Sequence, residues 1–474
     1  MTLTYDQQYI GRTWRTSLAT AFVDVQNPNT GKPLARVTCG HTQDAALAVD
    51  AAHDAFPAWF DTPLEQRTDL LRKFGAALAR RKDSLAQAMA SEIGTPLKIA
   101  HIVQVDAPIR NIQHFIQSIA SLAWEQQVGN SLIVREPFGV VACITPWNFP
   151  LHQIVLKVVP ALLAGNTVVL KPSELTPLTT QLISEALDES DFPAGVVNVV
   201  NGLGAEVGAF LAAAERVDMV SFTGSTEAGR AVSALAAATV KKVTTELGGK
   251  SPALVLPSGD LARAVKATLG SCMLNNGQTC SAHTRLLVPE DQQAQVDELL
   301  KLEMAKLTLG ESLADGTRVG PLISRQQQDR VKALIAEGIA QGAQAIHAPA
   351  SAPADGFFVS PQAFWVEPGN VLARNEVFGP VLSVMTYRDV DEAVRIANDT
   401  VFGLAAAVWG EPQEALQVAR RIRAGQVDIN GARFNALAPF GGFKQSGVGR
   451  EGGSVGLDEF LEYKAIQQNA PQQG

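Results

Sequence analysis

Apolar runs and helical patterns alternate regularly along the chain from about residue 139. The strand-like runs are GVVACITP (139–146), TVVLKP (167–172), VVNVVNG (196–202), VDMVSFTG (217–224) and KVTTELGG (242–249). The helix-like stretches between them are 151–165, 177–189, 205–215 and a stretch that begins at Ser225. Apolar strands separated by helices of this length build a parallel sheet with helices on both faces. This part of the chain therefore predicts an α/β, doubly wound nucleotide-binding domain.

A second alternating series follows from about residue 251 and predicts a second α/β domain. Its predicted helices are 260–274, 291–307, 324–341 and 389–397, and its predicted strands are 284–288, 404–409 and 425–430. Loops rich in Gly, Pro and Ala interrupt the series at 348–357 and 431–456. Before the first sheet, long helical patterns occupy 43–59, 63–92 and 97–121. Residues 122–138 interrupt the helical pattern and are expected to leave the domain before the sheet begins.

Length and charge narrow the class of protein. A chain of 474 residues predicts two or three domains with well-filled cores. The net charge of −8 and the lack of a basic patch argue against a nucleic-acid partner or an anionic membrane surface. The N-terminal residues lack the basic and apolar segments of a signal peptide, and Lys157 and Pro160 interrupt the longest apolar run. We therefore expect a cytoplasmic protein.

The four cysteines raise the question of a reactive thiol. Without a secretory signal, so few cysteines in a long chain argue against a disulfide framework. No CxxC or HxxxH pair is present, so we expect no metal site. Cys143 and Cys272 lie in apolar runs typical of core cysteines. Cys280 instead ends the polar stretch NNGQTC (275–280), where Asn275 to Gly277 predict the end of a helix, which leaves packing or reactivity open.

Three stretches that follow predicted strands could bind a nucleotide. GLGAEVG (202–208) resembles a dinucleotide fingerprint but has GxGxxxG spacing, and its glycines could equally end a strand tightly. FTGSTEAG (222–229) could offer backbone N–H groups and a hydroxyl to a pyrophosphate, or be an ordinary helix cap. In KPSE (171–174), Lys171 and Glu174 could hold the hydroxyls of a ribose, or form a solvated salt bridge.

Two further strand ends carry groups suited to catalysis. PWNFP (146–150) fixes an Asn between two prolines, and an amide in such a rigid loop can stabilise an oxyanion. ELGGK (246–250) places a carboxylate before paired glycines, where it could be a general base or only a turn between domains. His283, three residues after Cys280, permits a Cys–His pair, but the start of a strand is the better interpretation.

The order of these stretches resembles the aldehyde dehydrogenase superfamily. PWNFP, Gly165–Asn166, KPSE, FTGSTEAG, ELGGKSP, NNGQTC, EVFGPV (376–381) and PFGGFKQSG (439–447) share the family's order, and NPNTGKPLARV and GLDEFLEYK extend the similarity over almost the whole chain. The resemblance implies NAD(P)-dependent, hydrolytic oxidation of an aldehyde to a carboxylic acid. It also implies an NAD-binding domain (1–121 and 139–248), a catalytic domain (249–445), and a small β oligomerisation flap with a C-terminal tail (122–138 and 446–474).

By motif, the resemblance assigns the catalytic groups. Cys280 corresponds to the nucleophile, whose thiolate forms a thiohemiacetal that loses hydride to nicotinamide and becomes a thioester. Glu246 corresponds to the general base, which activates the water that hydrolyses the thioester and can also help to deprotonate the thiol. Asn148 and the backbone N–H of Cys280 correspond to the oxyanion hole.

The resemblance also assigns the cofactor site. Lys171 and Glu174 correspond to ligands of the adenosine ribose, Ser225 to a ligand of the pyrophosphate in the turn from Gly224 to Gly229, and Glu376 to a ligand of the nicotinamide ribose. The resemblance also implies that Phe378 lies against the nicotinamide ring, that Ile144 and Trp147 line the path of the cofactor, and that Gly204 and Gly208 pack near the adenine. A carboxylate at Glu174 accepts hydrogen bonds from a ribose 2′-hydroxyl and repels a 2′-phosphate, so we predict NAD over NADP.

The substrate tunnel is expected after PWNFP, around the cysteine and before PFGG. Its candidate residues are His152, Gln153, Leu156, Thr279, Ser281, Phe434 and Phe440. They predict a tunnel of mixed polarity with room for a medium-sized group, in which the two phenylalanines clamp an aliphatic or aromatic chain. No arginine is obviously placed to bind a carboxylated aldehyde, but Arg433 lies close enough in the sequence to leave such a substrate as an alternative.

Three alternatives keep the fold but change the function. Acyl transfer to coenzyme A is disfavoured by Glu246, which such relatives usually lack. A recruited, non-catalytic protein is disfavoured by intact Cys280, Glu246 and Asn148. A thiol esterase would act without NAD. The resemblance further predicts a homodimer or homotetramer.

Overall fold

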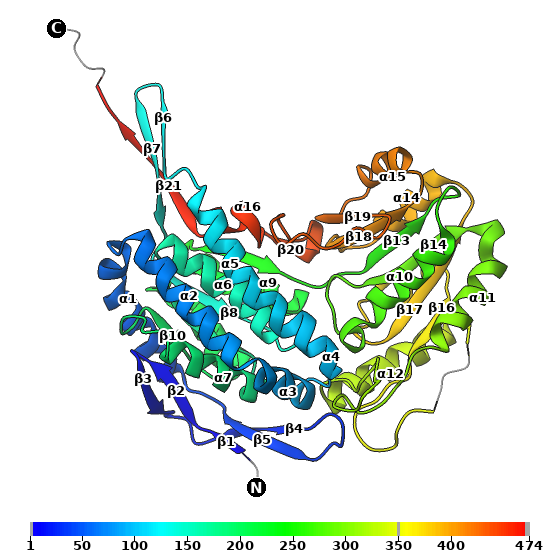
Figure 1. Ribbon diagram of the computed structural model, residues 1–474, viewed down its shortest axis with the longest axis horizontal. Coiled ribbons are helices and arrows are strands. Elements are labelled where there is room, and N and C mark those ends of the chain that lie inside the picture. The colour runs from blue at the N-terminus through cyan, green and yellow to red at the C-terminus, as the bar shows by residue number, and fades with distance from the viewer. Residues whose placement is uncertain (1–2, 348–350, 470–474) are drawn as a thin grey trace.

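The computed structural model describes residues 3–347 and 351–469 and has two lobes, each built on a mainly parallel β-sheet (Figure 1). Two three-stranded sheets complete the fold, one near the N-terminus and one that projects from the body beside the C-terminus (Figure 1). Residues 1–2 and 470–474, which the domain prediction includes, and residues 348–350 of a predicted loop lie outside the described residues.

The first lobe contains an eight-stranded sheet in the order β20-β12-β11-β8-β9-β10-β2-β3. The strands from β12 to β10 are parallel, and antiparallel strands extend both edges. Their bounds are β2 (Gln7–Ile10), β3 (Thr13–Thr16), β8 (Val140–Ile144), β9 (Thr167–Lys171), β10 (Val197–Val199), β11 (Met219–Thr223), β12 (Lys242–Glu246) and β20 (Gly447–Val448). The chain runs outward from β8 in both directions, so the sheet is doubly wound as predicted. Its switch point lies between β8 and β11, where such sheets bind ligands.

Helices cover both faces of this sheet because alternate strand residues point to opposite sides. Val141 and Cys143 pack with α2, α3, α5, α6 and α7, whereas Val140 and Ala142 pack with α1, α8 and α9. The helix bounds are α1 (Thr42–Phe60), α2 (Leu64–Arg80), α3 (Lys82–Glu92), α5 (Ala107–Ala120), α6 (Pro150–Ala164), α7 (Pro177–Asp188), α8 (Ala209–Ala213) and α9 (Thr226–Ala236). The layered core explains why most of these strands have mainly apolar sequences rather than a strict alternation of apolar and polar residues.

Three predicted helices are more irregular than their periodicity indicates. The stretch 63–92 divides into α2 and α3 at Arg81, whose ψ of 11° interrupts the helix. The stretch 97–121 begins with α4 (Leu97–Ile99) and a π-helical segment (Ala100–Asp106) before α5. The stretch 205–215 has a π-helical turn (Gly204–Gly208) before α8. A helical pattern reports one buried face and is insensitive to local changes in hydrogen bonding.

Helix α6 is the most deeply buried helix of the first lobe. Every residue from Pro150 to Ala164 except His152 is buried, because the helix packs between the sheet and α2, α5 and α7. Its 15 residues are about 22 Å long, which is shorter than the ~30 Å apolar layer of a bilayer. Across residues 3–347 and 351–469, no helix combines the length and apolar character needed to cross a membrane.

The second lobe has a seven-stranded sheet in the order β15-β16-β17-β14-β13-β18-β19, parallel except at β15. Its strands are β13 (Ser251–Val255), β14 (His283–Pro289), β15 (Gln344–Ala345), β16 (Gln362–Trp365), β17 (Val381–Tyr387), β18 (Ala405–Trp409) and β19 (Gln426–Ile429). Its helices are α10 (Leu261–Met273), α11 (Gln293–Met304), α12 (Arg325–Ala340), α13 (Val371–Arg374), α14 (Val390–Asn398) and α15 (Pro412–Ala419). The predicted second α/β domain is present, with strands β13, β15, β16 and β17 in addition to those predicted.

Short strands missing from the prediction occupy the N-terminal region. β1 (Leu3–Tyr5), β4 (Phe22–Gln26) and β5 (Pro33–Thr38) form one three-stranded sheet, and β2 and β3 extend the first large sheet. The predicted flap is the other small sheet. In it, β6 (Glu125–Val128) and β7 (Ser131–Pro137) form a hairpin that pairs with β21 (Leu461–Gln467), which follows the short helix α16 (Gly453–Asp458) (Figure 1). β20 pairs with β12, so residues 447–448 of the predicted tail belong to the first large sheet.

Candidate active site

The two large sheets meet where β12 of the first sheet leads into β13 of the second. Glu246 ends β12, and residues 247–250 connect it to Ser251 at the start of β13. Ser251 pairs with His283, which starts β14 three residues after Cys280. A Cβ on Gly249 would lie 2.5 Å from the carbonyl oxygen of Cys280, so only glycine permits this approach. The connection therefore brings the predicted base and nucleophile to one junction, and His283 starts a strand as expected.

The cysteine follows a turn with a strained backbone. Helix α10 ends at Met273, and φ is +52° at Asn275, +62° at Asn276 and +79° at Gly277. A Cβ on Gly277 would lie 2.1 Å from the backbone carbonyl of Gly379, so a side chain there would collide with that segment. Left-handed residues other than glycine cost on the order of 1 kcal/mol or more each, so the surrounding contacts must hold this turn.

Side-chain amides provide those contacts. Asn148 Nδ2 donates to the carbonyl oxygen of Gln278 at 3.1 Å, and Asn275 Nδ2 donates to the carbonyl oxygen of Asn148 at 2.9 Å. Gln278 Nε2 donates to the carbonyl oxygen of Asn275 at 3.2 Å, and Asn276 Nδ2 donates to that of Gly94 at 2.8 Å. Asn148, from the loop after β8, is thereby tied directly to the segment that presents Cys280.

The Cys280 thiol lies in an environment that favours its protonated form. Burial, together with the nearby carboxylates of Glu376 and Glu246, raises the pKa of Cys280 to about 12, while the backbone N–H of Ser281 acts in the opposite direction. A thiol with such a pKa is almost fully protonated at neutral pH. Formation of the thiolate therefore requires a base beside the sulfur or a local change in charge.

Glu246 is buried and has an environment suited to proton exchange. Burial and the charge of Glu451 raise its pKa well above the usual range, while Lys157 and Arg450 act in the opposite direction. Within the described part of the chain, neither carboxylate oxygen of Glu246 has a hydrogen-bond partner. A Cβ on Gly441 would lie 2.5 Å from Glu246 Oε1, so this glycine keeps the space beside the carboxylate open.

A buried ion pair that sequence reasoning did not find lies beside Glu246. Lys157 Nζ donates to Glu451 Oε1, and the two side chains are 1% and 4% exposed. Lys157 comes from α6, and Glu451 comes from the predicted loop 431–456. A lysine within the apolar helix pattern was the available signal for Lys157. Glu451 carried no signal, because its loop position is typical of a solvated residue.

The cofactor candidates of the first sheet gather at its carboxyl edge. Lys171 Nζ and Glu174 Oε2 are 3.1 Å apart, and a Cβ on Gly208 would lie 3.8 Å from Lys171 Cδ. Ser225 Oγ accepts from the Ala228 N–H and caps α9, in the turn between Gly224 and Gly229. Gly204 is exposed at the start of its π-helical turn, and Ile144 is buried at the end of β8.

The switch point also contains buried hydroxyls available to a polar ligand. Thr145 follows β8, and Thr223 ends β11. Both hydroxyl groups are buried, and neither has a hydrogen-bond partner among residues 3–347 and 351–469. Buried polar groups normally have partners, so unpaired hydroxyls at this edge fit a bound molecule with hydrogen-bonding groups. The residues present therefore fit a dinucleotide.

The second lobe contributes Glu376 and Phe378 across the junction. Glu376 Oε1 accepts from the Gly249 N–H at 3.0 Å, and burial raises the pKa of Glu376 to about 7. Phe378 has a left-handed φ of +57°, and its ring meets Trp147 edge to face at 5.4 Å between centroids. Helix α12 supports this loop, because Gln327 donates to the Phe378 carbonyl and Arg330 to the Glu376 carbonyl, each at 2.9 Å.

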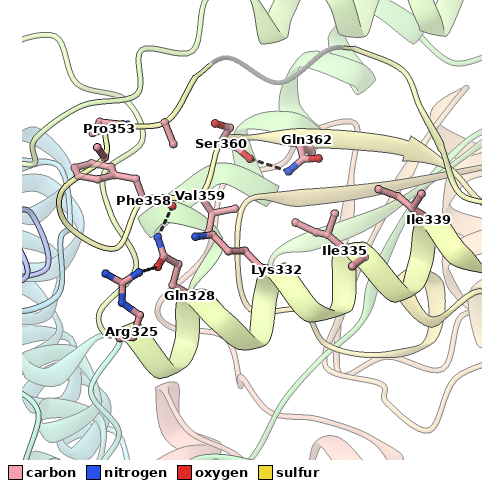
Figure 2. Close-up of a pocket in the computed structure, with 13 residues that line it drawn as sticks. Arg325, Gln328, Lys332, Ile335, Ile339, Pro353, Phe358, Val359, Ser360 and Gln362 are labelled. Carbon is pink, nitrogen blue, oxygen red and sulfur yellow. Dashed lines mark hydrogen bonds between the residues drawn. The ribbon is translucent and has the colours of Figure 1, made fainter.

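The opposite side of α12 lines a separate cavity of about 540 Å³ (Figure 2). Arg325, Lys332 and Ile335 face it from the helix, and Phe358 and Val359 face it from the following segment (Figure 2). Its lining residues include none of the predicted catalytic, cofactor or tunnel residues. The junction around Cys280, rather than this cavity, therefore holds the candidate chemistry.

The tunnel candidates come from three segments. On α6, Gln153 and Leu156 are buried. His152 is partly buried, and the loss of hydration there lowers its pKa to about 4, so its imidazole is neutral at physiological pH. Thr279 and Ser281 flank Cys280 and are partly buried. Phe434 and Phe440 meet at 6.1 Å between centroids with an angle of 71°, and Phe434 is 54% exposed. These two rings form an aromatic pair with one member at the surface.

Comparison with known proteins agrees with this geometry. The model of the aldehyde dehydrogenase family matches residues 14–466. A 3-succinoylsemialdehyde-pyridine dehydrogenase from a Pseudomonas species is 42% identical over 473 residues, which cover 98% of each chain.

Solved structures agree as well. A cysteine-to-alanine mutant of aldehyde dehydrogenase C from Pseudomonas syringae, in complex with NAD+ and octanal, superimposes with a TM-score of 0.97 at 42% identity, covering 99% of this chain and 98% of that chain. A Mycobacterium tuberculosis aldehyde dehydrogenase in complex with NAD+ superimposes with a TM-score of 0.95 at 35% identity, covering 100% of both chains. The chain belongs to the aldehyde dehydrogenase family and is an oxidoreductase that oxidises aldehydes.

Proposed function

We propose that Cys280 is the nucleophile of an NAD-dependent oxidation of an aldehyde to a carboxylic acid. The observation that carries this proposal is the turn at 275–280, which presents Cys280 at the domain junction together with Glu246 and Asn148. The thiolate of Cys280, formed when the thiol proton passes to a base at the junction or to water, attacks the carbonyl carbon, and the carbonyl oxygen becomes the oxyanion of a thiohemiacetal. NAD, when bound, would supply the hydride acceptor, and loss of hydride from this carbon would leave the acyl group on Cys280 as a thioester.

Asn148 and the backbone N–H of Cys280 stabilise the oxyanion. The Asn148 amide has two N–H groups, and one of them donates to the Gln278 carbonyl oxygen. That bond fixes the amide plane and leaves the second N–H for the substrate oxygen. A donor held in place before the reaction needs no reorganisation when charge develops, which is why such groups contribute strongly to catalysis.

Glu246 takes the proton of the water that hydrolyses the thioester. Its raised pKa makes the carboxylate a stronger base than an exposed glutamate, and its oxygens are unengaged within the described residues. Burial is the largest cause of the raised pKa of Glu246, and within the neighbouring ion pair Glu451 raises this pKa while Lys157 lowers it. Water rather than coenzyme A is the acceptor because this base is present.

NAD is the preferred cofactor. Lys171 and Glu174 would hold the adenosine ribose, Ser225 the pyrophosphate and Glu376 the second ribose. Glu206 is a second carboxylate in the region of Glu174. Burial is the main cause of the raised pKa of Cys39, and the charges of Glu206 and Glu174 raise this pKa as well, so both carboxylates act on the same thiol. Two carboxylates disfavour the 2′-phosphate of NADP. The NAD+ complexes of the Pseudomonas and Mycobacterium relatives support the same choice.

The substrate is a medium-sized aldehyde with an aliphatic or aromatic chain. Leu156 and the Phe434–Phe440 pair provide apolar surface, and neutral His152 adds a polar group without charge. Two relatives support this class: the Pseudomonas syringae enzyme binds octanal, an aliphatic aldehyde, and the 3-succinoylsemialdehyde-pyridine dehydrogenase is named for an aldehyde with an aromatic ring.

The flap of β6, β7 and β21 supports assembly as a homodimer or homotetramer. It projects from the body and exposes Val128, Tyr463 and Ile466 (Figure 1). Light scattering during gel filtration tests this assignment, and a monomer at micromolar concentration contradicts it. A cytoplasmic location stays a prediction from the N-terminal residues and the interrupted apolar runs.

The function is tested by measuring NADH formation with short, long, aromatic, amino and carboxylated aldehydes. We expect the highest kcat/KM for medium-length aliphatic or aromatic aldehydes. In Cys280→Ala, NADH formation should be abolished with every aldehyde while NAD binding is retained. Turnover by this variant would contradict the nucleophile assignment.

A further inference from the structure

The side chain of Gln104 reaches the turn before Cys280 from a distant segment. Gln104 is buried in the π-helical segment Ala100–Asp106, and no motif of the sequence includes it. Its Nε2 donates to Thr95 Oγ1 at 2.8 Å and to Asn275 Oδ1 at 3.1 Å. Thr95 Oγ1 also donates to Asn275 Oδ1, at 2.6 Å. Gln104, Thr95 and Asn275 thus form a closed set of three buried side chains.

Asn275 transmits this arrangement to the reactive groups. Its Oδ1 faces Gln104 and Thr95, and its Nδ2 donates to the carbonyl oxygens of Asn148 at 2.9 Å and Gln278 at 3.3 Å. A flipped Asn275 amide would place its nitrogen against the Gln104 nitrogen and its oxygen against the Asn148 carbonyl. The donors supplied by Gln104 therefore allow one orientation of the Asn275 amide.

We propose that Gln104 is a positioning residue for aldehyde oxidation: its amide nitrogen fixes the Asn275 side chain, which holds the Asn148 backbone and the turn that carries Cys280. This inference rests on the proposed roles of Cys280 and Asn148. Gln104 acts through Asn275 and Thr95, and through them it aims the oxyanion donor and the nucleophile at the same point.

The unpaired oxygen of Gln104 argues that its nitrogen is needed. Gln104 Oε1 is buried and has no hydrogen-bond partner in residues 3–347 and 351–469. A methionine would fill similar volume without burying an unpaired oxygen, so packing alone favours an apolar residue here. Both contacts of the Gln104 amide use its nitrogen, and both go to the side chains that orient the cysteine turn. The π-helical backbone at this position is also a feature that is frequent at functional sites.

The experiment compares three variants with the wild-type protein. Gln104→Met removes both donors at similar volume. Gln104→Glu keeps the shape, and its side chain can donate only when it is protonated. Gln113→Met is the matched control, because Gln113 is exposed on α5. For each protein, the single-turnover rate of NADH formation, KM for NAD and aldehyde, and the unfolding temperature are measured.

We expect Gln104→Met to lower the single-turnover rate and kcat roughly ten- to a hundred-fold, because small misplacements of reacting groups have effects of this size. KM for NAD should stay within about twofold, and Gln113→Met should match the wild type. For Gln104→Glu, the rate relative to the wild type should rise as pH falls, because protonation restores a donor. For Gln104→Met, the same ratio should not vary with pH.

A wild-type single-turnover rate in folded Gln104→Met would overturn the inference, as would a pH-independent ratio for Gln104→Glu. If Gln104→Met does not fold, the pH profile of Gln104→Glu decides alone. Cys280→Ala, measured in parallel, separates the two proposals. Activity in Cys280→Ala refutes the proposed catalytic roles, whereas an inactive Cys280→Ala with unaffected Gln104 variants refutes only the role of Gln104.

Discussion

Replacing Glu246 with glutamine tests whether this carboxylate acts on water after hydride transfer. The substitution preserves shape and removes the charge. Because neither Glu246 oxygen has a hydrogen-bond partner among the described residues, Glu246→Gln breaks no bond that the structure shows there. Lys157 keeps Glu451 as its partner, so no buried cation is left alone. We therefore expect a folded protein with an altered reaction.

The expected effect differs between the two halves of the reaction. Loss of a general base typically slows the step that it serves roughly a hundred- to ten-thousand-fold. Glu246 is also one of the carboxylates that raise the pKa of Cys280, so its removal favours the thiolate and should not slow the first half-reaction by depleting it. Mixed rapidly with NAD and aldehyde, the variant should release about one NADH per subunit in a burst and then stall.

Stopped-flow measurement of NADH absorbance distinguishes the possibilities. Acid quenching at the stall should trap the acyl group on Cys280, which mass spectrometry of the intact subunit detects. A loss of both burst and steady state would mean that Glu246 acts before hydride transfer. Unchanged steady-state turnover would remove Glu246 from the mechanism. The Cys280→Ala variant provides the baseline without a burst.

Three further predictions address separate parts of the site. Asn148→Ala should lower kcat about a hundred- to a thousand-fold through loss of an oxyanion donor, and an effect below tenfold in steady-state assays would contradict the role. The rate of Cys280 alkylation by iodoacetamide should keep rising with pH, because the pKa of Cys280 is about 12 and only the thiolate reacts. Glu246→Gln should increase this rate at any fixed pH below that value, because it removes a charge that raises the pKa of Cys280. Equal rates in the two proteins would refute the electrostatic effect of Glu246 on Cys280. Lys157→Met should lower the free energy of unfolding by about 3–5 kcal/mol, because Glu451 loses its buried partner. Lys301→Met, in an exposed pair with Glu298, is its control and should cost less than about 1 kcal/mol in urea unfolding.

The alternation of apolar runs and helical patterns determined much of the fold. Buried parallel strands are rich in apolar residues, and this local property, with the helical patterns between them, identified the segments that form β8, β9, β10, β11 and β12. The end of α10 before NNGQTC could also be predicted from local sequence, because Asn and Gly tolerate the left-handed backbone found there. Because parallel strands share one carboxyl edge, the motifs that follow them lie at that edge, and Asn148 and Glu246 there adjoin the segment that carries Cys280.

Tertiary structure decided the contacts between segments far apart in the chain. Lys157 and Glu451 pair across 294 positions, and Ser131 in the hairpin bonds Gln467 across 336. Gln104 meets Asn275 across 171 positions. Periodicity reports which face of an element is buried and carries no information on which distant side chain will satisfy a buried polar group. The sequence by itself therefore determined the central strands of the first sheet, most of the long helices and the reactive motifs, but not the short N-terminal strands or several strands of the second sheet. The pKa of Cys280, the charges around Glu246 and the support of the cysteine turn arise from burial and neighbours that only the folded chain brings together.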